Sequence, residues 1–196
     1  MGVKLIYDKD KMLNDILFLL DAGESLSDVA KFDILKAIGW HYTERKDPGT
    51  PKAKKLGCTY WTQEAFDIVF ECKGGKYSLR PGVKNKIDHV VIHEHVVPKE
   101  VFITSIMNFK GKIDKESLKK ILDDNYFACI VSPSEAKELD KNNKMSMPGS
   151  KNLFTISNPW ERYIKAGFES VLKLEWELGT RRSWQLVSKE VYKLPR

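Results

Sequence analysis

Several features that mark particular classes of protein are scarce in this chain. Only three of its 196 residues are cysteines, Cys58, Cys72 and Cys129, and no two of them form a CxxC pair. The sequence therefore indicates neither a cysteine-rich zinc site nor a disulfide framework, and a reducing cytoplasm is the expected location. No apolar run approaches the ~18 residues of a membrane span, and the early charged segment from Asp8 to Lys11 argues against a signal peptide.

The charge balance favours an anionic partner. Lysine and arginine total 33 residues against 27 aspartates and glutamates, which gives a net charge of +6. Nucleic acid is the commonest partner of such a protein, although a lysine-rich surface also serves solubility alone. The hydrophobic content of 42% suffices for a single domain over residues 1–196. Within it, residues 1–57 are a candidate helical N-terminal lobe and residues 58–196 a candidate catalytic part.

Hydrophobic periodicity predicts an α+β fold with a helix-rich N-terminal part, a mixed α/β part with short antiparallel strands, and a C-terminal β-hairpin. Helical spacing predicts helices over residues 10–20, from Ser25 or Ser27 to a stop at Gly39, and over residues 61–72 before Gly74 and Gly75. Helix-capping residues, prolines suited to a first helical turn and acidic residues shortly after them predict further helices. These helices are expected to begin near Pro98, Asp114, Ser132 and Asn158. Short strands are expected over residues 87–97, 126–131 and 153–156, and the hairpin over residues 171–178 and 184–192.

Histidine is also scarce, yet three of the four histidines, His89, His93 and His95, lie within seven residues, with Glu94 among them. A neutral imidazole can take a proton and a carboxylate can hold a hard cation, so the segment predicts a divalent-metal hydrolytic site. On a strand the three histidines would share one face and Glu94 the other. Alternatively, Glu94 and His95 diverge where the strand ends and line one pocket. Inert, hydrogen-bonded histidines are an equally weighted interpretation.

The run from Glu94 to Pro98, Glu-His-Val-Val-Pro, resembles the acid-His-hydrophobic-hydrophobic-Pro signature of HNH nucleases, also called His-Me finger or ββα-metal nucleases. The resemblance implies a ββα site around one divalent ion, Mg²⁺ or Mn²⁺, with Zn²⁺ as an alternative. It also implies that His95 is the general base and Glu94 the acidic metal ligand. His93 is a further candidate catalytic residue and metal ligand in this hypothesis. The order of segments from residue 61 to about 168 is similar to that of bacterial HNH-like proteins.

The chain departs from the family pattern downstream of this motif. HNH nucleases place an Asn and a final His or Asn soon after the first His, whereas the nearest candidates here are Asn152 and Asn158. Both are predicted metal ligands, and Asn158 also fits an N-cap, which we favour. The resemblance implies an endonuclease that acts on DNA rather than RNA, suited to restriction or anti-phage defence. A homodimer is the usual arrangement when such an enzyme cuts a palindrome.

Three alternatives remain open on sequence grounds. Glu71 and Lys73 match the Glu-x-Lys of PD-(D/E)xK nucleases, but that fold needs them on a strand and the local spacing favours a helix. The protein could also be a non-catalytic nucleic-acid-binding or regulatory protein, or a metal hydrolase of another class built on His89, His93 and His95.

Basic side chains flank the histidine segment and occupy two expected loops. Cations at phosphates supply affinity without sequence information, so these residues are candidates for nucleic-acid binding, although any single cluster could equally be a solvated surface. Trp40, Trp61, Trp160 and Trp176 are expected in cores, whereas Trp184 is a candidate to stack on bases. The predicted nucleic-acid-binding residues are Lys52, Lys54, Lys55, Lys84, Lys86, Lys99, Arg181, Arg182 and Trp184.

Overall fold

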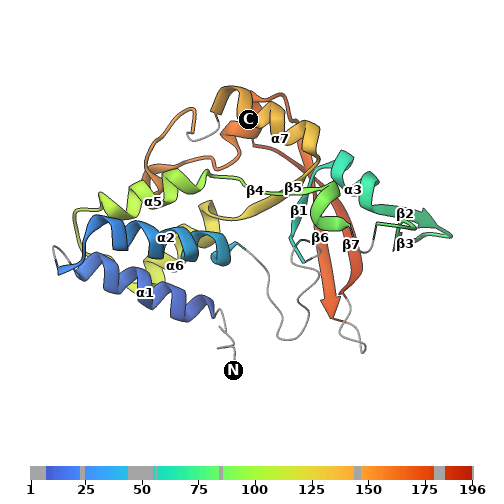
Figure 1. The fold of residues 1–196 in the computed structure, drawn as a ribbon. Helices are drawn as coiled ribbons and strands as arrows, with labels where there is room; N and C mark the ends of the chain where they lie inside the picture. Colours follow the sequence, from blue (N-terminus) through green and yellow to red (C-terminus); the bar gives the residue numbers. More distant parts are fainter. Residues whose placement is uncertain are drawn as a thin grey trace.

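The computed structural model of the protein has an α+β fold, in which a group of helices lies beside a mixed sheet (Figure 1). It describes residues 8–22, 25–43, 55, 57–83, 86–143, 147–178 and 184–195. The first half of the chain forms α1 (Lys9–Asp21), α2 (Asp28–Tyr42), β1 (Tyr60–Trp61), α3 (Gln63–Val69), β2 (Phe70–Lys73), β3 (Lys76–Leu79), α4 (Ile87–Val90) and β4 (Ile92–His95). The second half forms α5 (Lys99–Met107), α6 (Lys115–Asn125), β5 (Ala128–Val131), α7 (Pro133–Asn143), the 3-10 helix η2 (Leu153–Thr155), α8 (Glu161–Lys165), β6 (Ser170–Leu178) and β7 (Trp184–Lys193).

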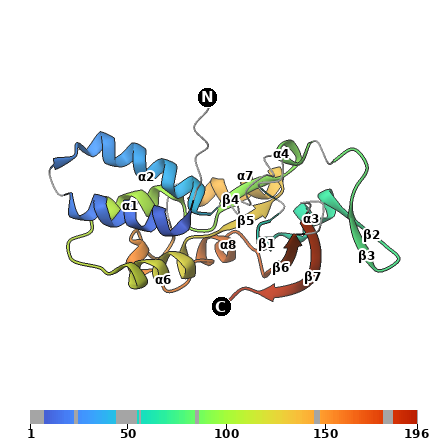
Figure 2. The same cartoon turned by 90° about the horizontal axis from the view of Figure 1, so that it is seen from below.

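The main sheet has five strands in the order β4-β5-β1-β6-β7. Only β1 and β5 run parallel, and the other neighbours are antiparallel. All four residues of β5 are buried, as expected for a strand covered on both faces: Ile130 packs into one hydrophobic cluster, and Cys129 and Val131 into another. The expected C-terminal hairpin is confirmed as β6 and β7, with a register shift at Glu175 and Trp176. The strands β2 and β3 form a separate two-stranded sheet that follows α3 and lies at the opposite end of the molecule from α1 and α2 (Figure 2).

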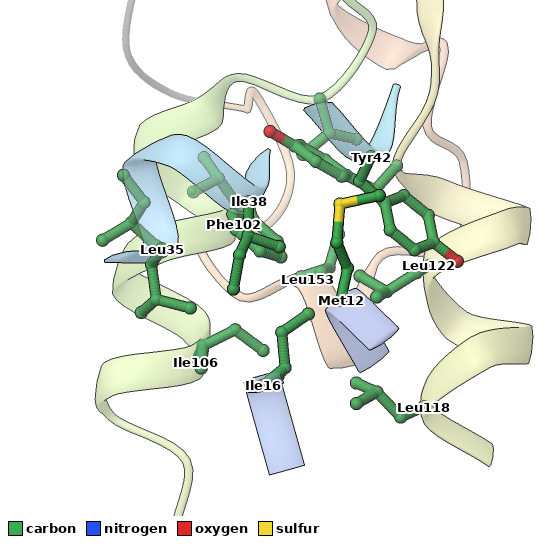
Figure 3. Packing of buried hydrophobic residues seen from close by; sticks show 14 of the residues in the cluster. Met12, Ile16, Leu35, Ile38, Tyr42, Phe102, Ile106, Leu118, Leu122 and Leu153 are labelled. Atoms are coloured by element: carbon green, nitrogen blue, oxygen red, sulfur yellow. The ribbon is translucent and has the colours of Figure 1, made fainter. Parts of the chain in front are cut away.

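The helical layer takes its members from two distant parts of the chain. The apolar side of α1 and α2 packs against α5 and α6, which follow β4 in sequence. Figure 3 shows the shared core, in which Met12, Ile16 and Leu35 meet Ile106 and Leu118. Full burial of one such side chain contributes about 1.5–3 kcal/mol, so this core holds the N-terminal helices against the segment that follows β4.

Local signals placed most helix starts correctly. Ser27 caps α2 by accepting from the Ala30 amide, and Asp114 caps α6 by accepting from the Ser117 amide. The capping box before α7 is reciprocal: Ser132 Oγ accepts from the Glu135 amide, and a Glu135 carboxylate oxygen accepts from the Ser132 amide at 2.8 Å. Among the described residues, no helix is long and apolar enough to cross a lipid bilayer.

Four predicted elements were wrong in type or extent. Residues 87–97 are not one strand, because α4 occupies Ile87–Val90 before β4 begins. The helix expected over residues 61–72 ends at Val69, and residues 153–156 contain η2 instead of a strand. Short apolar runs fit either a helix or a strand, so periodicity alone does not separate them. Gly39 does not end α2, which continues to Tyr42; a Cβ at Gly39 would lie 2.8 Å from the Tyr126 hydroxyl, so the glycine permits close packing.

Candidate functional site

The strand β4 presents its polar residues on two faces. His93 and His95 share one face, where their ring centroids lie 5.4 Å apart beside the indole of Trp40. Glu94 alternates to the other face, toward Arg162 of α8. Successive side chains therefore alternate between the two faces of β4 as far as His95, as predicted for histidines on a strand. His89 lies on α4 and not on this strand, so the predicted three-histidine face does not form.

His95 is held by contacts that define its tautomer. Its Nε2 lies 3.3 Å from the carbonyl oxygen of Gly39 and 3.2 Å from Oγ1 of Thr43. The Thr43 hydroxyl donates to the carbonyl of Trp40, so it accepts from His95, and both contacts require a proton on Nε2. The lone pair of the ring then lies on Nδ1. The ring also stacks on Tyr126 at a centroid distance of 5.5 Å.

The imidazole of His95 is neutral at physiological pH. Burial, followed by repulsion from His93, lowers the pKa of His95 to about 3. The hydrogen bond to Gly39 opposes this change but is the smaller effect. A neutral ring with one protonated and one unprotonated nitrogen is the form that can accept a proton.

Glu94 forms an ion pair with an arginine that sequence reasoning did not assign. Arg162 is fully buried, and its Nη2 donates to Oε1 of Glu94 at 2.5 Å while Nη1 donates to the His95 carbonyl at 3.3 Å. A carboxylate oxygen of Asp140, on α7, lies 4.0 Å from Nη2. Burial raises the pKa of Glu94, and the nearby Arg162 cation only partly offsets that effect. The Nε of Arg162 is buried without a hydrogen-bond partner among the described residues.

A cavity of about 260 Å³ lies where these groups meet at the end of β4. It joins residues from β4, α5, α7 and α8, which are far apart in sequence. The cavity is lined by Glu94, His95, Pro98, Lys99, Glu100, Asp140 and Arg162. Glu94 and His95 both line this cavity, although their side chains leave opposite faces of β4 and the His95 ring packs beside Trp40, His93 and Tyr126, which do not line it.

Protein-family models, curated proteins and solved structures provided no match. The resemblance of residues 94–98 to HNH nucleases therefore remains a prediction from this chain alone. The structure adds one observation to it. The antiparallel strands β4 and β5 are followed directly by α7, which contacts β4, with α5 and α6 inserted between the strands.

The residues at the cavity fit a divalent cation with few protein ligands. Within the described residues, no three His, Cys, Asp or Glu side chains lie close enough together to form a complete metal cage. Mg²⁺, however, is usually held by one or two carboxylates together with waters and substrate phosphates. Arg162 Nη2 is bonded to Oε1 of Glu94, which leaves Oε2 as a candidate ligand atom, and a carboxylate oxygen of Asp140 lies 4.0 Å from the same Nη2. The oxygen chemistry of this pair suits Mg²⁺ or Mn²⁺ better than Zn²⁺.

The two asparagines predicted as metal ligands have structural roles instead. Asn152 Oδ1 accepts from the Phe154 amide and caps η2. Asn158 Oδ1 accepts from the Trp160 amide, and its Nδ2 donates to the carbonyl of Pro195. Neither residue lines the cavity. The preferred N-cap role of Asn158 was wrong in position, because the N-cap of α8 is Trp160 and Asn158 instead holds the turn that precedes it.

The predicted nucleic-acid-binding cations divide into three groups. Lys99 lines the cavity, and Lys86 is exposed just before α4. Lys55 has an internal role, because its Nζ donates to the backbone carbonyls of Asp88 and Val91. The remaining predictions lie outside the described residues, namely Lys52, Lys54, Lys84, Arg181, Arg182 and the side chain of Trp184.

The Glu-x-Lys pair does lie on a strand, contrary to the helix expected there. Glu71 and Lys73 belong to β2, and their side chains form an ion pair with an N–O distance of 2.8 Å. The strand pairs only with β3, in the two-stranded sheet that is separate from the main sheet. Within the described part of the chain, no cluster of metal-ligating residues forms around them. The local geometry thus accounts for them as a surface ion pair.

Proposed function

We propose that this protein is an HNH-like endonuclease that hydrolyses phosphodiester bonds in DNA with a divalent metal. One observation carries the proposal. A single cavity is lined by the Glu-His pair of the motif, by two further carboxylates, Glu100 and Asp140, and by two cations, Lys99 and Arg162. These are the groups that hydrolysis of a phosphodiester needs: a proton acceptor, ligands for a hard cation, and positive charge for the phosphate.

His95 is the proposed general base. The contacts of Nε2 with Gly39 and Thr43 leave the lone pair of the ring on Nδ1. In this proposal Nδ1 accepts a proton from the attacking water. In the free protein the low pKa makes this nitrogen a weak base. A phosphate anion bound in the cavity would stabilise the protonated ring and raise that pKa, so base strength would develop when the substrate binds.

The cations and carboxylates of the cavity have separate proposed roles. Lys99 binds a phosphate oxygen, and the buried guanidinium of Arg162 fixes Glu94 and the His95 backbone relative to each other. Glu94 and Asp140 would hold the divalent ion. When bound, such an ion neutralises charge that develops on the phosphate during hydrolysis. The β4-β5-α7 order supports the proposal, because the resemblance implies two antiparallel strands followed by a helix.

A non-catalytic nucleic-acid-binding protein is the second candidate. The observation that favours it is the ion pair of Glu94 with Arg162, because a buried carboxylate that already has a cation has less need of a metal. In that case the same residues stabilise the junction of β4 and α8, and the net charge of +6 provides the affinity for the nucleic acid.

The test is a plasmid-nicking assay with Mg²⁺ or Mn²⁺ on wild type, His95→Ala and Asp140→Asn. Asp140 is partly exposed, so its variant should fold even if loss of the buried His95 ring destabilises the protein. His89→Ala is the matched control, since His89 is exposed on α4 outside the cavity. We expect metal-dependent nicking that both site variants lose and the control retains. Nicking that survives in both site variants refutes the proposed site, and DNA binding by wild type without nicking favours the second candidate.

A further inference from the structure

One tryptophan lies at the protein surface beside the candidate site, although sequence reasoning expected it in a core. Trp40, in the last turn of α2, is 41% exposed, whereas the other tryptophans with described side chains are buried. Its ring centroid lies 5.5 Å from that of His93 and 5.7 Å from that of His95. The Nζ atom of Lys99 lies 6.0 Å from the same ring. The indole thus borders the residues that line the cavity.

The surroundings of Trp40 are polar and cationic. Two imidazoles and an ammonium group lie next to the indole, and no carboxylate among the described residues forms an ion pair with Lys99. Other exposed apolar residues of α2 are Val29, Phe32 and Ile34, so the groups that set Trp40 apart are its polar and cationic neighbours. A flat ring beside an ammonium group matches a nucleotide, which has an aromatic base and an anionic phosphate.

We infer that Trp40 and Lys99 form a subsite for an unpaired nucleotide next to the cavity. In this arrangement the base stacks on the indole of Trp40, and Lys99 contacts an adjacent phosphate. Aromatic residues bind any base through its π-face, so the subsite carries little sequence preference. The inference rests on the proposed function in that it places the bound strand at the cavity of Glu94 and His95.

The stacking requirement identifies the class of substrate. Inside a duplex both faces of a base are covered by the neighbouring base pairs, so an indole on a protein surface cannot reach one without unstacking it. An unpaired base offers a free face without that cost. The preferred ligand is therefore single-stranded DNA, or duplex DNA that is locally opened, rather than a continuous duplex.

Binding without metal tests this inference separately from cleavage. Full-length protein in EDTA is titrated with a twelve-nucleotide deoxythymidine oligomer and with a twelve-base-pair duplex, and tryptophan fluorescence and fluorescence anisotropy of a labelled oligomer are both recorded. We expect tighter binding of the single strand, with quenching of the indole. Trp40→Ala should weaken single-strand binding about 5- to 150-fold, the range expected for one stacked base. Trp40→Phe should retain most of the affinity but lose most of the quenching.

Two further variants separate stacking from charge and from folding. Phe32→Ala is the matched control, because it removes an aromatic ring of similar exposure from the same helix and should leave binding unchanged. Lys99→Gln should lower the slope of log affinity against log salt by roughly 0.7, the value for one phosphate contact on a single strand. Cooperative thermal melting of each variant establishes that it is folded.

The outcomes distinguish this inference from the proposed function. If Trp40→Ala binds the single strand like wild type, or if wild type prefers the duplex or binds neither DNA, the subsite is refuted whatever the nicking assay shows. If Trp40→Ala loses binding while no wild-type nicking occurs with any metal, the subsite stands and the nuclease does not.

Discussion

The ion pair between Arg162 and Glu94 gives a quantitative prediction for the variant Arg162→Met. Methionine keeps much of the side-chain volume but removes the guanidinium, which leaves the Glu94 carboxylate without its cation in a largely buried position. Breaking a buried ion pair by removing one partner costs about 3–5 kcal/mol. For a chain of this length, that cost corresponds to a decrease in Tm of roughly 6 to 20 °C.

The pH dependence of this cost identifies its cause. Burial raises the pKa of Glu94 and Arg162 lowers it, so removal of the guanidinium leaves the raising effects unopposed. A carboxyl group whose pKa is higher in the folded state contributes stability only while it is protonated, and that contribution is lost as the pH rises through the folded pKa. The stability deficit of Arg162→Met relative to wild type should therefore be largest at neutral pH. It should shrink as the pH falls toward 4.5, the ordinary value for the group.

Urea unfolding followed by far-UV circular dichroism at several pH values measures this deficit. Lys165→Met, an exposed cation on the same helix, is the matched control and should change stability by less than about 0.5 kcal/mol. The double variant Arg162→Met with Glu94→Gln should recover part of the loss, because no buried charge is then left alone. A deficit for Arg162→Met below about 1 kcal/mol, or one that does not change with pH, would be the behaviour of a surface pair and would refute this account.

Three further predictions concern single residues that do not line the cavity. Gly39→Ala should destabilise the protein by about 1–3 kcal/mol in urea unfolding, because the new Cβ would lie 2.8 Å from the Tyr126 hydroxyl; equal or greater stability would contradict this packing. Ser105→Ala should cost about 1–3 kcal/mol and reduce hydrogen-exchange protection of the Leu153 amide, which donates to the Ser105 hydroxyl in the core; unchanged protection would show that the bond is absent. Lys73→Ala should leave Tm and nicking within error of wild type, because its ion pair is exposed; loss of nicking would move the active site to β2.

Local sequence signals predicted the elements whose ends are set by nearby residues. The capping box at Ser132 and the cap at Asp114 satisfy amide groups within their own first turn, so the following helices could be placed without tertiary information. The C-terminal hairpin was predictable because alternation extends over both long strands. By contrast, apolar and polar residues alternate or cluster through residues 87–97 without a break signal, and only contacts with the rest of the chain divide the segment into α4 and β4.

The sequence by itself determined the segment that carries the candidate chemistry, because Glu94 and His95 are adjacent and their residue types are visible without a fold. Only the tertiary structure decided their partners. Arg162 and Asp140 follow them by 68 and 46 positions and reach them through the packing of α7 and α8. The exposure of Trp40 was likewise beyond prediction, since a tryptophan at helical spacing usually lies in a core. Hydrophobic periodicity predicts which face of a helix or strand is apolar. It does not predict which distant elements pack together, and the cavity is formed by that packing.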